Sequence, residues 1–214
     1  MRPHKTKKRK SSAYEKRRLI LNAAIRVFAQ KGFHRCRISD IASEAGVAYG
    51  LVYHYFEHKE AILNTIFDEN WGLFTKVLET IKEQPEPLEK KLLAVVSMLL
   101  DAYKLFPDII QVIVMEIARS SKFLKKPKIE AFEKSFQRFA DILEHHKKTG
   151  EVRSDVDTKL LAYSLFGSIE LIFTAYILGS LVPGDDQAYE ALKIYLVKVI
   201  MDGIRSRPLV AQAS

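Results

Sequence analysis

Side chains able to hydrogen-bond to a polyanion gather between residues 37 and 56. The guanidinium of Arg37 can pair with a guanine edge, and Tyr53 and His54 carry donors that can reach phosphate oxygens. Gly50 has no side chain, so the backbone there can approach a ligand closely. These residue types suit non-covalent recognition of DNA.

Two short helices are needed to position these groups, and the sequence predicts them over residues 39–45 and 48–55. Ala45-Gly46-Val47 forms the tight turn between them. The second helix packs Tyr49, Tyr53, His54, Tyr55 and Phe56 into eight residues. Tyr55 and Phe56 are expected to anchor the helix in the core. The pattern is typical of a helix-turn-helix that docks on DNA.

Positive charge lies directly before this stretch. The chain has 34 Lys and Arg against 26 Asp and Glu. Residues 1–18 hold nine basic residues and one acid, so the remaining 25 bases and 25 acids cancel. A basic arm beside a reading helix suits a polyanion, although a solvated tail would have the same composition. We expect residues 1–13 to be a disordered arm.

Cysteine usage and the N-terminus indicate the cytoplasm. Cys36 is the one cysteine of the chain, which excludes an intrachain disulfide and a zinc site built on several cysteines. It suits a small half-buried slot better than a redox sensor. The N-terminal arm lacks the apolar stretch of a secretory signal peptide. No metal-ligand set, phosphate-binding glycine loop or nucleophile–base pair is recognisable, so we predict no enzyme and no cofactor.

The stretch 160–178 is almost entirely apolar and close to the length that spans a bilayer. Glu170 lies at its centre, where an acid costs about 2.5 kcal/mol or more in lipid. A helix packed on a core by one face and on a partner by the other has the same composition. We therefore expect a buried helix and no membrane association.

The periodicity is helical throughout, which predicts an all-α protein of nine helices. In order, the predicted helices span residues 14–31, 39–45, 48–55, 59–83, 88–105, 108–121, 129–147, 158–178 and 186–205. Residues 14–74 are expected to form the DNA-binding domain, with its helix-turn-helix at 37–56, and residues 75–214 the ligand-binding and dimerisation domain. Helix 59–83 links the two without a flexible linker.

With these motifs in place, the sequence resembles the TetR family of transcriptional repressors. The matching residues are Gly32-Phe33, Ile38-Ser39-Asp40-Ile41-Ala42, Ala45-Gly46-Val47, Gly50, Tyr53-His54-Tyr55-Phe56 and Lys59-Glu60. The likeness is specific over residues 14–74 and weaker beyond. It implies a homodimer on a palindromic operator, with the helix at 48–55 in the major groove.

By position, the resemblance implies a set of DNA contacts: Arg37, Ala48, Tyr49, Gly50, Leu51, Tyr53, His54 and Lys59. Tyr53, His54 and Lys59 suit phosphate contacts, which leaves base reading to Arg37, Tyr49 and Leu51. The chain departs from the family at positions 37, 48 and 49, where Ser or Thr, Ser and Lys are usual. Two helix caps are therefore expected to be weaker by about 1 kcal/mol each, and a different operator is expected.

The C-terminal domain is implied to bind a small effector that releases DNA. The segments Met115-Glu116-Ile117-Ala118-Arg119-Ser120 and Leu165-Phe166-Gly167-Ser168-Ile169-Glu170 resemble the fatty-acid-responsive branch of the family. That likeness implies an acyl tunnel with basic groups for the CoA phosphates at its mouth, from Arg119, Lys122, Lys125, Lys126 and Lys128. Our candidate ligand residues are Tyr103, Phe106, Met115, Glu116, Arg119, Phe136, Phe139, Tyr163, Phe166 and Glu170.

Other effectors are compatible with the same residues. A cationic drug could use Glu170 or Glu116 as counter-ion, with aromatic faces adding cation–π contacts, as in a multidrug-responsive repressor of an efflux gene. A body without a cavity would instead favour an architectural DNA-binding protein with no effector. An isolated buried carboxylate is costly, so Glu170 is expected to have a partner or to face water or a cavity.

The two C-terminal helices are the predicted dimer surface. Helix 158–178 is too apolar to face water, and helix 186–205 is expected to present Tyr189, Leu192, Leu196, Val199 and Ile200 on one side. Two copies of each helix would form a four-helix interface. The dimer would then set the separation of the two reading helices to about 34–36 Å or a multiple of it.

Overall fold

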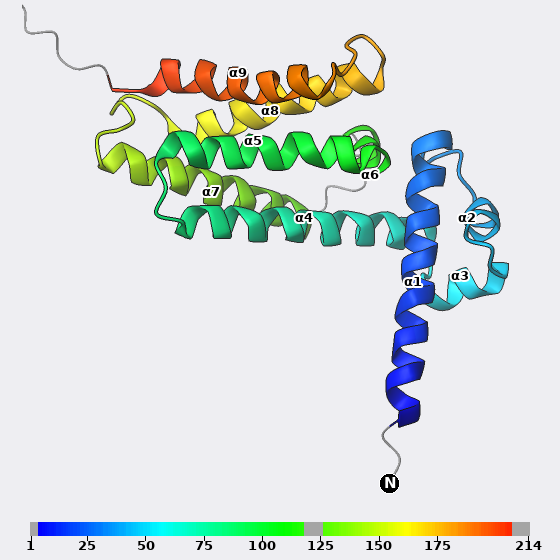
Figure 1. Ribbon diagram of the computed structural model, residues 1–214. Coiled ribbons are helices and arrows are strands. Elements are labelled where there is room, and N and C mark those ends of the chain that lie inside the picture. Colours follow the sequence, from blue (N-terminus) through cyan, green and yellow to red (C-terminus); the bar gives the residue numbers. More distant parts are fainter. Residues whose placement is uncertain (1–3, 118–125, 207–214) are drawn as a thin grey trace, which may run out of the picture. The chain divides into compact units, whose positions relative to one another are not determined.

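The computed structural model describes residues 4–117 and 126–206, and these residues form an all-helical protein (Figure 1). The nine α-helices within them match the predicted number. They are α1 (His4–Lys31), α2 (Ile38–Ala45), α3 (Tyr49–Tyr55), α4 (Lys59–Glu83), α5 (Leu88–Leu105), α6 (Pro107–Val112), α7 (Lys126–Lys148), α8 (Thr158–Ile177) and α9 (Asp186–Ile204). The predicted fold class is therefore confirmed.

The first helix is longer than the sequence analysis predicted. It begins at His4 and not near Tyr14, so most of the range expected to be a disordered arm is helical. The cause is local: residues 4–31 contain neither proline nor glycine, and Lys, Arg and Ala favour helix. Gly32, with a φ of 77°, ends α1 as expected.

The sixth helix is shorter than predicted and changes its geometry. Pro107 starts α6 at the helix position that tolerates a missing N–H, and α6 ends at Val112. A π-helical turn, η1 (Ile113–Ile117), follows it. Such turns are rare and frequently lie at functional sites. The predicted remainder of this helix, residues 118–121, lies outside the described residues.

The described residues divide into two compact units, and the division differs from the predicted domains. The head unit comprises residues 4–70 and 106–117, and the body unit comprises residues 71–105 and 126–206. In the head unit, α1 packs against both α2 and α6. The amide nitrogen of Gln111 on α6 donates to the carbonyl of Ala29 on α1, at 2.8 Å. The α6 segment, assigned by sequence to the C-terminal domain, is thus part of the head unit.

Helix α5 lies at the centre of the body unit, in contact with α7, α8 and α9 (Figure 1). Its buried face carries Leu88, Leu92, Val95, Val96 and Leu100. The second half of α4 joins this core through Leu78 and Ile81, which are both buried. This packing of helix on helix supplies an apolar core without any strand in the described residues.

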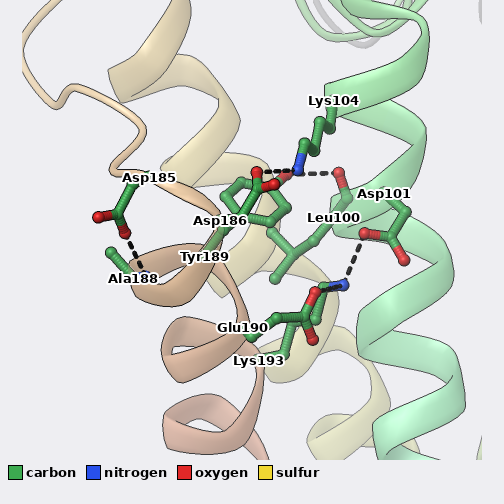
Figure 2. Close-up of polar contacts among 9 residues, drawn as sticks. All are labelled: Leu100, Asp101, Lys104, Asp185, Asp186, Ala188, Tyr189, Glu190 and Lys193. Carbon is green, nitrogen blue, oxygen red and sulfur yellow. Dashed lines mark hydrogen bonds and ion pairs between the residues drawn. The ribbon is translucent and has the colours of Figure 1, made fainter.

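Polar contacts hold the end of α5 to α9 (Figure 2). The ammonium of Lys193, which is almost completely buried, lies 2.6 Å from carboxylate oxygens of both Asp101 and Glu190. The hydroxyl of Tyr189 donates to the carbonyl of Leu100. Burial alone would lower the pKa of Lys193, but the two carboxylates outweigh it and raise that pKa. Lys193 therefore stays charged and fastens α9 to α5.

The exposed face of α9 differs from the face expected to meet a partner. Tyr189 is buried against α5, because its spacing of four residues to Lys193 and then Val197 places all three on the inner face. Val199 is exposed as expected, and Leu192, Leu196 and Ile200 are half-buried. The large apolar residues Ile194 and Tyr195, which the sequence analysis did not select, are 60% and 63% exposed.

Helix α8 is long and apolar enough to cross a membrane by length and composition, as the sequence suggested. Its inner face is buried through Ala162, Leu165, Ile169 and Phe173. Its outer face exposes Leu160, Ser164, Gly167, Ser168 and Leu171. Leu160 and Leu171 are 65% and 69% exposed, so a second apolar or small-residue surface would be needed to cover this face.

Candidate functional site

The helix-turn-helix is built from a short buried core and one obligatory glycine. Gly46 adopts a φ of 63°, and its N–H caps α2 by donating to carbonyls of that helix. Ile41, Val52 and Phe56 are buried between the helices, and Tyr55 is half-buried, so the anchoring predicted for Phe56 is confirmed. This core orients α3 so that its opposite face is free.

The free face of α3 carries most of the predicted DNA contacts. Ala48, Tyr49, Gly50, Tyr53 and His54 are all exposed, and Leu51 is half-buried. A β-carbon added at Gly50 would have no atom within 4 Å, so the surface there is open. These residues form an exposed polar and aromatic strip on α3, and the major groove of DNA is wide enough to admit an α-helix.

Tyr49 and Tyr53 behave as one unit on this strip. Their hydroxyl oxygens are 3.2 Å apart, and their rings meet edge to face with centroids separated by 5.2 Å. They are 53% and 44% exposed. The hydrogen bond with Tyr49 raises the pKa of Tyr53, so the Tyr53 hydroxyl keeps its proton and remains a donor.

Both helix caps are weak, as the departures from the family pattern predicted. Neither Arg37, before α2, nor Ala48, before α3, forms a side-chain hydrogen bond to its helix. Asp40 compensates at α2, because its carboxylate accepts from the backbone N–H of Arg37 at 2.8 Å. That hydrogen bond, together with the ammonium of Lys31, lowers the pKa of Asp40.

Lys59 is the predicted DNA contact that the structure places in another role. Its ammonium points into the loop between α1 and α2, where it donates to the carbonyls of Phe33 at 2.6 Å and Cys36 at 2.8 Å. It also lies 3.3 Å from the carbonyl of His34 and 4.4 Å from the ring centroid of Phe33. The ammonium is thus engaged by the loop carbonyls in this structure, and its predicted contact with a phosphate stays a prediction.

Cys36 has the structural character expected of it. The side chain is buried, and its thiol contacts the carbonyl of Arg37 at 3.4 Å. Burial raises the pKa of this thiol to about 11, and the nearby charge of Lys59 only partly opposes that effect. The group is a neutral thiol at pH 7, which disfavours the redox-sensor alternative.

A small apolar cavity lies in the body unit between α4, α5, α7 and α8. Its volume of about 10 Å³ is at the lower limit for a single water molecule. It is lined by Phe74, Val95, Leu99, Ser135, Phe136, Phe139, Leu165 and Phe166. Three of the predicted ligand residues, Phe136, Phe139 and Phe166, are therefore at this cavity.

Aromatic rings fill the space around the cavity. Phe136 is stacked on Tyr163 with centroids 4.3 Å apart, and it meets Phe132 at 4.6 Å and Phe166 at 5.0 Å. Trp71 is stacked on Phe132 at 4.9 Å. We call these five rings, together with Phe74, the aromatic cluster. Because the rings already contact one another, any larger ligand must separate them.

The other predicted ligand residues in the described part of the chain do not line the cavity. Tyr103 is stacked on Phe173 of α8, with centroids 5.3 Å apart. Phe106, Met115 and Glu116 belong to the head unit, where a β-carbon added at Gly32 would lie 3.3 Å from Oε1 of Glu116. The cavity therefore gives no support to the prediction that these residues contact a ligand.

Two further predictions concern charged residues of this region. Glu170 is half-buried on α8 and so reaches water, one of the two environments expected for it. Arg119, Lys122 and Lys125 lie outside the described residues. The basic connector is also shorter than expected, because Lys126 and Lys128 fall inside α7.

Two features of the sites, at Ser135 and Asp40, were not predicted from the sequence. Ser135 is fully buried, and its hydroxyl lies 2.7 Å from that of Thr75. Its signal was present as a polar residue on the apolar seam of α7, beside Phe136. Asp40 was recognised as part of the family pattern but not as the acceptor for Arg37; its position three residues after a cap was the available signal.

The sequence matches two family descriptions that together cover most of the chain. Residues 20–66 match "Bacterial regulatory proteins, tetR family", and residues 67–195 match "YsiA-like protein, C-terminal region". The second match alone spans more than half of the chain. The first match includes the exposed strip of α3, and the second includes the aromatic cluster.

Full-length similarity extends to regulators of fatty acid metabolism. The "Fatty acid metabolism regulator protein" of Bacillus subtilis (strain 168) is 29% identical over 191 residues, which are 88% of this chain and 95% of that protein. The fatty acid degradation regulator FadR from Bacillus halodurans is 26% identical and superimposes with a TM-score of 0.78, over 90% of this chain and 97% of that one. FadR from Bacillus subtilis in complex with stearoyl-CoA is 27% identical, with a TM-score of 0.75 over 87% and 98% of the chains.

Proposed function

Because the chain belongs to the TetR family of bacterial regulatory proteins, we propose that it is a homodimeric repressor released from operator DNA by a long-chain acyl-CoA. Members of this family are cytoplasmic DNA-binding transcriptional regulators and not enzymes. The observation that carries the proposal is the full-length similarity to fatty acid regulators, one of which has been solved with stearoyl-CoA.

The DNA-binding part of the proposal assigns the exposed strip of α3 to the major groove. Tyr53 and His54 donate to phosphates, Gly50 allows close approach of the backbone, and Ala48 contributes its backbone. Arg37, Tyr49 and Leu51 read base edges. Lys59 is left out of this set, since its ammonium is occupied by three carbonyl oxygens.

The dimer part assigns the interface to the outer faces of α8 and α9. The exposed apolar residues Leu171 on α8 and Ile194 and Tyr195 on α9 support it, because a soluble monomer rarely leaves such a surface uncovered. Gly167, with Ser164 and Ser168, would let two copies of α8 approach closely. Both helices pack on α5, which gives the interface a firm support.

The effector part assigns the acyl chain to the aromatic cluster. The cavity lining is apolar apart from Ser135, which suits a hydrocarbon chain. The chain would have to separate the rings, since the present volume is about that of one water molecule. The binding energy spent on this separation is what would couple the effector to a change of conformation.

The cationic alternative has less support at this cavity. None of the eight residues that line it carries a carboxylate, and Glu170, the proposed counter-ion, is half-buried on α8 without lining it. A cation in an apolar site without a counter-charge would be costly. The effector-free alternative is favoured by one observation, the small volume of the cavity, and it is separated from the proposal by experiment.

A release titration tests the proposed function. The operator would be selected from random DNA with the full-length protein, and the complex followed by fluorescence anisotropy during titration with stearoyl-CoA, free CoA or a lipophilic cation. We expect stearoyl-CoA alone to release the DNA. Release by the cation only would overturn the acyl-CoA assignment, and no release by any of the three would favour the effector-free alternative.

A further inference from the structure

One peptide group beside the reading helix is held on both of its edges. The carbonyl of Cys36 accepts from the ammonium of Lys59 at 2.8 Å. The N–H of Arg37, which belongs to the same peptide plane, donates to Oδ2 of Asp40 at 2.8 Å. Two charged side chains from different helices, α4 and α2, therefore fix the orientation of this plane.

The ammonium of Lys59 has no hydrogen left for a phosphate. It has three donors, and it lies within hydrogen-bond distance of three carbonyl oxygens, those of Phe33, His34 and Cys36. The ring of Phe33 adds a cation–π contact on the same group. Turning Lys59 toward DNA would break all of these contacts and leave the loop carbonyls without their donor.

Asp40 is held equally firmly on the other edge. Its second oxygen accepts from the ammonium of Lys31 at 2.9 Å, so both oxygens are engaged. The low pKa of this carboxyl keeps it ionised at neutral and moderately acidic pH. A charged acceptor makes a stronger hydrogen bond to the Arg37 N–H than a neutral one would.

Fixing this peptide plane also positions Arg37, because the Cα that carries its side chain is bonded directly to the nitrogen of the plane. Its backbone is extended, with φ of −109° and ψ of 156°, and its side chain is exposed. We propose that Lys59 and Asp40 are positioning residues that aim Arg37 at the DNA, and that Lys59 does not contact a phosphate. This inference rests on the base-reading role proposed above for Arg37.

The test compares how variants read single base pairs. Full-length protein would be measured on its selected operator and on a set of operators with one base pair changed, at several salt concentrations. The variants are Arg37→Ala, Lys59→Met and Asp40→Ala, with Lys76→Met at an exposed position of α4 as a matched control. Deletion of residues 2–12, which removes six Lys and Arg residues, shows what a loss of phosphate contacts looks like.

We expect Arg37→Ala to lose discrimination at one base pair by about 5- to 100-fold, the range of a good bidentate contact. Lys59→Met and Asp40→Ala should lose at least about 5-fold at that same base pair, with the salt dependence of binding unchanged. Asp40→Asn keeps an acceptor oxygen and should recover most of the discrimination. Lys76→Met should match the wild type.

Other outcomes separate the possible failures. If Lys59→Met weakens all operators equally and its salt slope falls by about one, Lys59 contacts a phosphate and the inference is wrong. Unchanged discrimination in both Lys59→Met and Asp40→Ala also contradicts it. If Arg37→Ala itself changes no base preference, the base-reading role in the proposed function has failed instead. Should Lys59→Met not fold, Asp40→Ala and Asp40→Asn decide the question.

Discussion

The head unit and the body unit use aromatic residues in opposite ways. On α3, Tyr49 and Tyr53 are about half exposed and present their hydroxyls to solvent. In the body unit, Phe136 and its neighbours contact one another and leave a cavity of about 10 Å³. Under the proposed function, the first surface is ready to bind DNA, whereas the second must be opened by the effector.

This difference has an energetic meaning for regulation. A surface that binds without rearrangement spends its interaction energy on affinity. A cluster that must be separated spends part of the ligand's binding energy on a change of conformation, and a ligand shifts an equilibrium only by its differential affinity for the two states. The open strip and the closed cluster thus suit a DNA contact and a regulatory contact, respectively.

The largest expected effect is the loss of the proposed dimer interface. Leu171→Glu on α8 would place a charge on each side of the proposed dimer interface, where an unpaired buried charge costs several kcal/mol. We expect a monomer at micromolar concentration in sedimentation experiments, with loss of operator binding. Leu73→Glu, on an exposed position of α4, is the control and should remain dimeric. A dimeric Leu171→Glu variant would exclude this face.

The next effect tests the close packing of the aromatic cluster. Phe136→Ala removes the ring that contacts Tyr163, Phe132 and Phe166, and should lower the free energy of unfolding by about 3–5 kcal/mol. Urea denaturation measures this, with Leu73→Ala as an exposed control expected within about 0.5 kcal/mol of the wild type. A loss below about 1 kcal/mol would mean that the cluster is loosely packed, and the contrast between the units would weaken.

A smaller effect tests the readiness of the strip on α3. Tyr53→Phe should weaken operator binding by about 1.5 kcal/mol, because it removes a donor to a charged oxygen, and should leave the unfolding free energy nearly unchanged. Since Tyr49 and Tyr53 share a hydrogen bond, the double variant with Tyr49→Phe should lose less than the sum of the single losses. Thr80→Val, which removes an exposed hydroxyl of α4, serves as control. Strict additivity would show that the two hydroxyls act independently.

The smallest effect concerns the loop that carries Arg37. The folded-state pKa of Cys36 is raised to about 11 from an ordinary value of 9.0, so the folded protein binds this proton more tightly than the unfolded chain. Its contribution to stability is complete below pH 9 and is lost as pH rises toward 11. The difference between the thermal unfolding midpoints of the wild type and Cys36→Ala should therefore shrink as the pH rises from 9 to 11. Rapid alkylation of the folded protein at pH 7.5 would contradict the burial of the thiol.

The helices of the head unit were predictable because local features of the sequence determine them. Gly46, Gly32 and the buried positions of α2 and α3 are set by local geometry, and the predicted helices there are correct within one residue, apart from the start of α1. The start of α1 differed because charge composition predicts solvation but does not prevent helix formation.

The sites were less predictable, because side-chain partners are not local. Lys59 and Cys36 are 23 residues apart, and nothing in the sequence shows that the ammonium reaches the carbonyl. In the body unit, cavity-lining Phe136 and core-filling Leu143 lie on the same apolar seam of α7. Tertiary packing alone distinguishes them, so three of the ten proposed ligand residues were found at the cavity.

The most direct measurement of the central claim uses Trp71, the single tryptophan of the chain, which is stacked on Phe132 within the aromatic cluster. Its emission and the anisotropy of labelled operator would be followed together during titration with stearoyl-CoA. An effector that opens the cluster predicts a change in Trp71 emission that saturates over the same concentrations as the release of DNA. Release of DNA with Trp71 emission unchanged would contradict the account, because the effector would then act without entering the cluster.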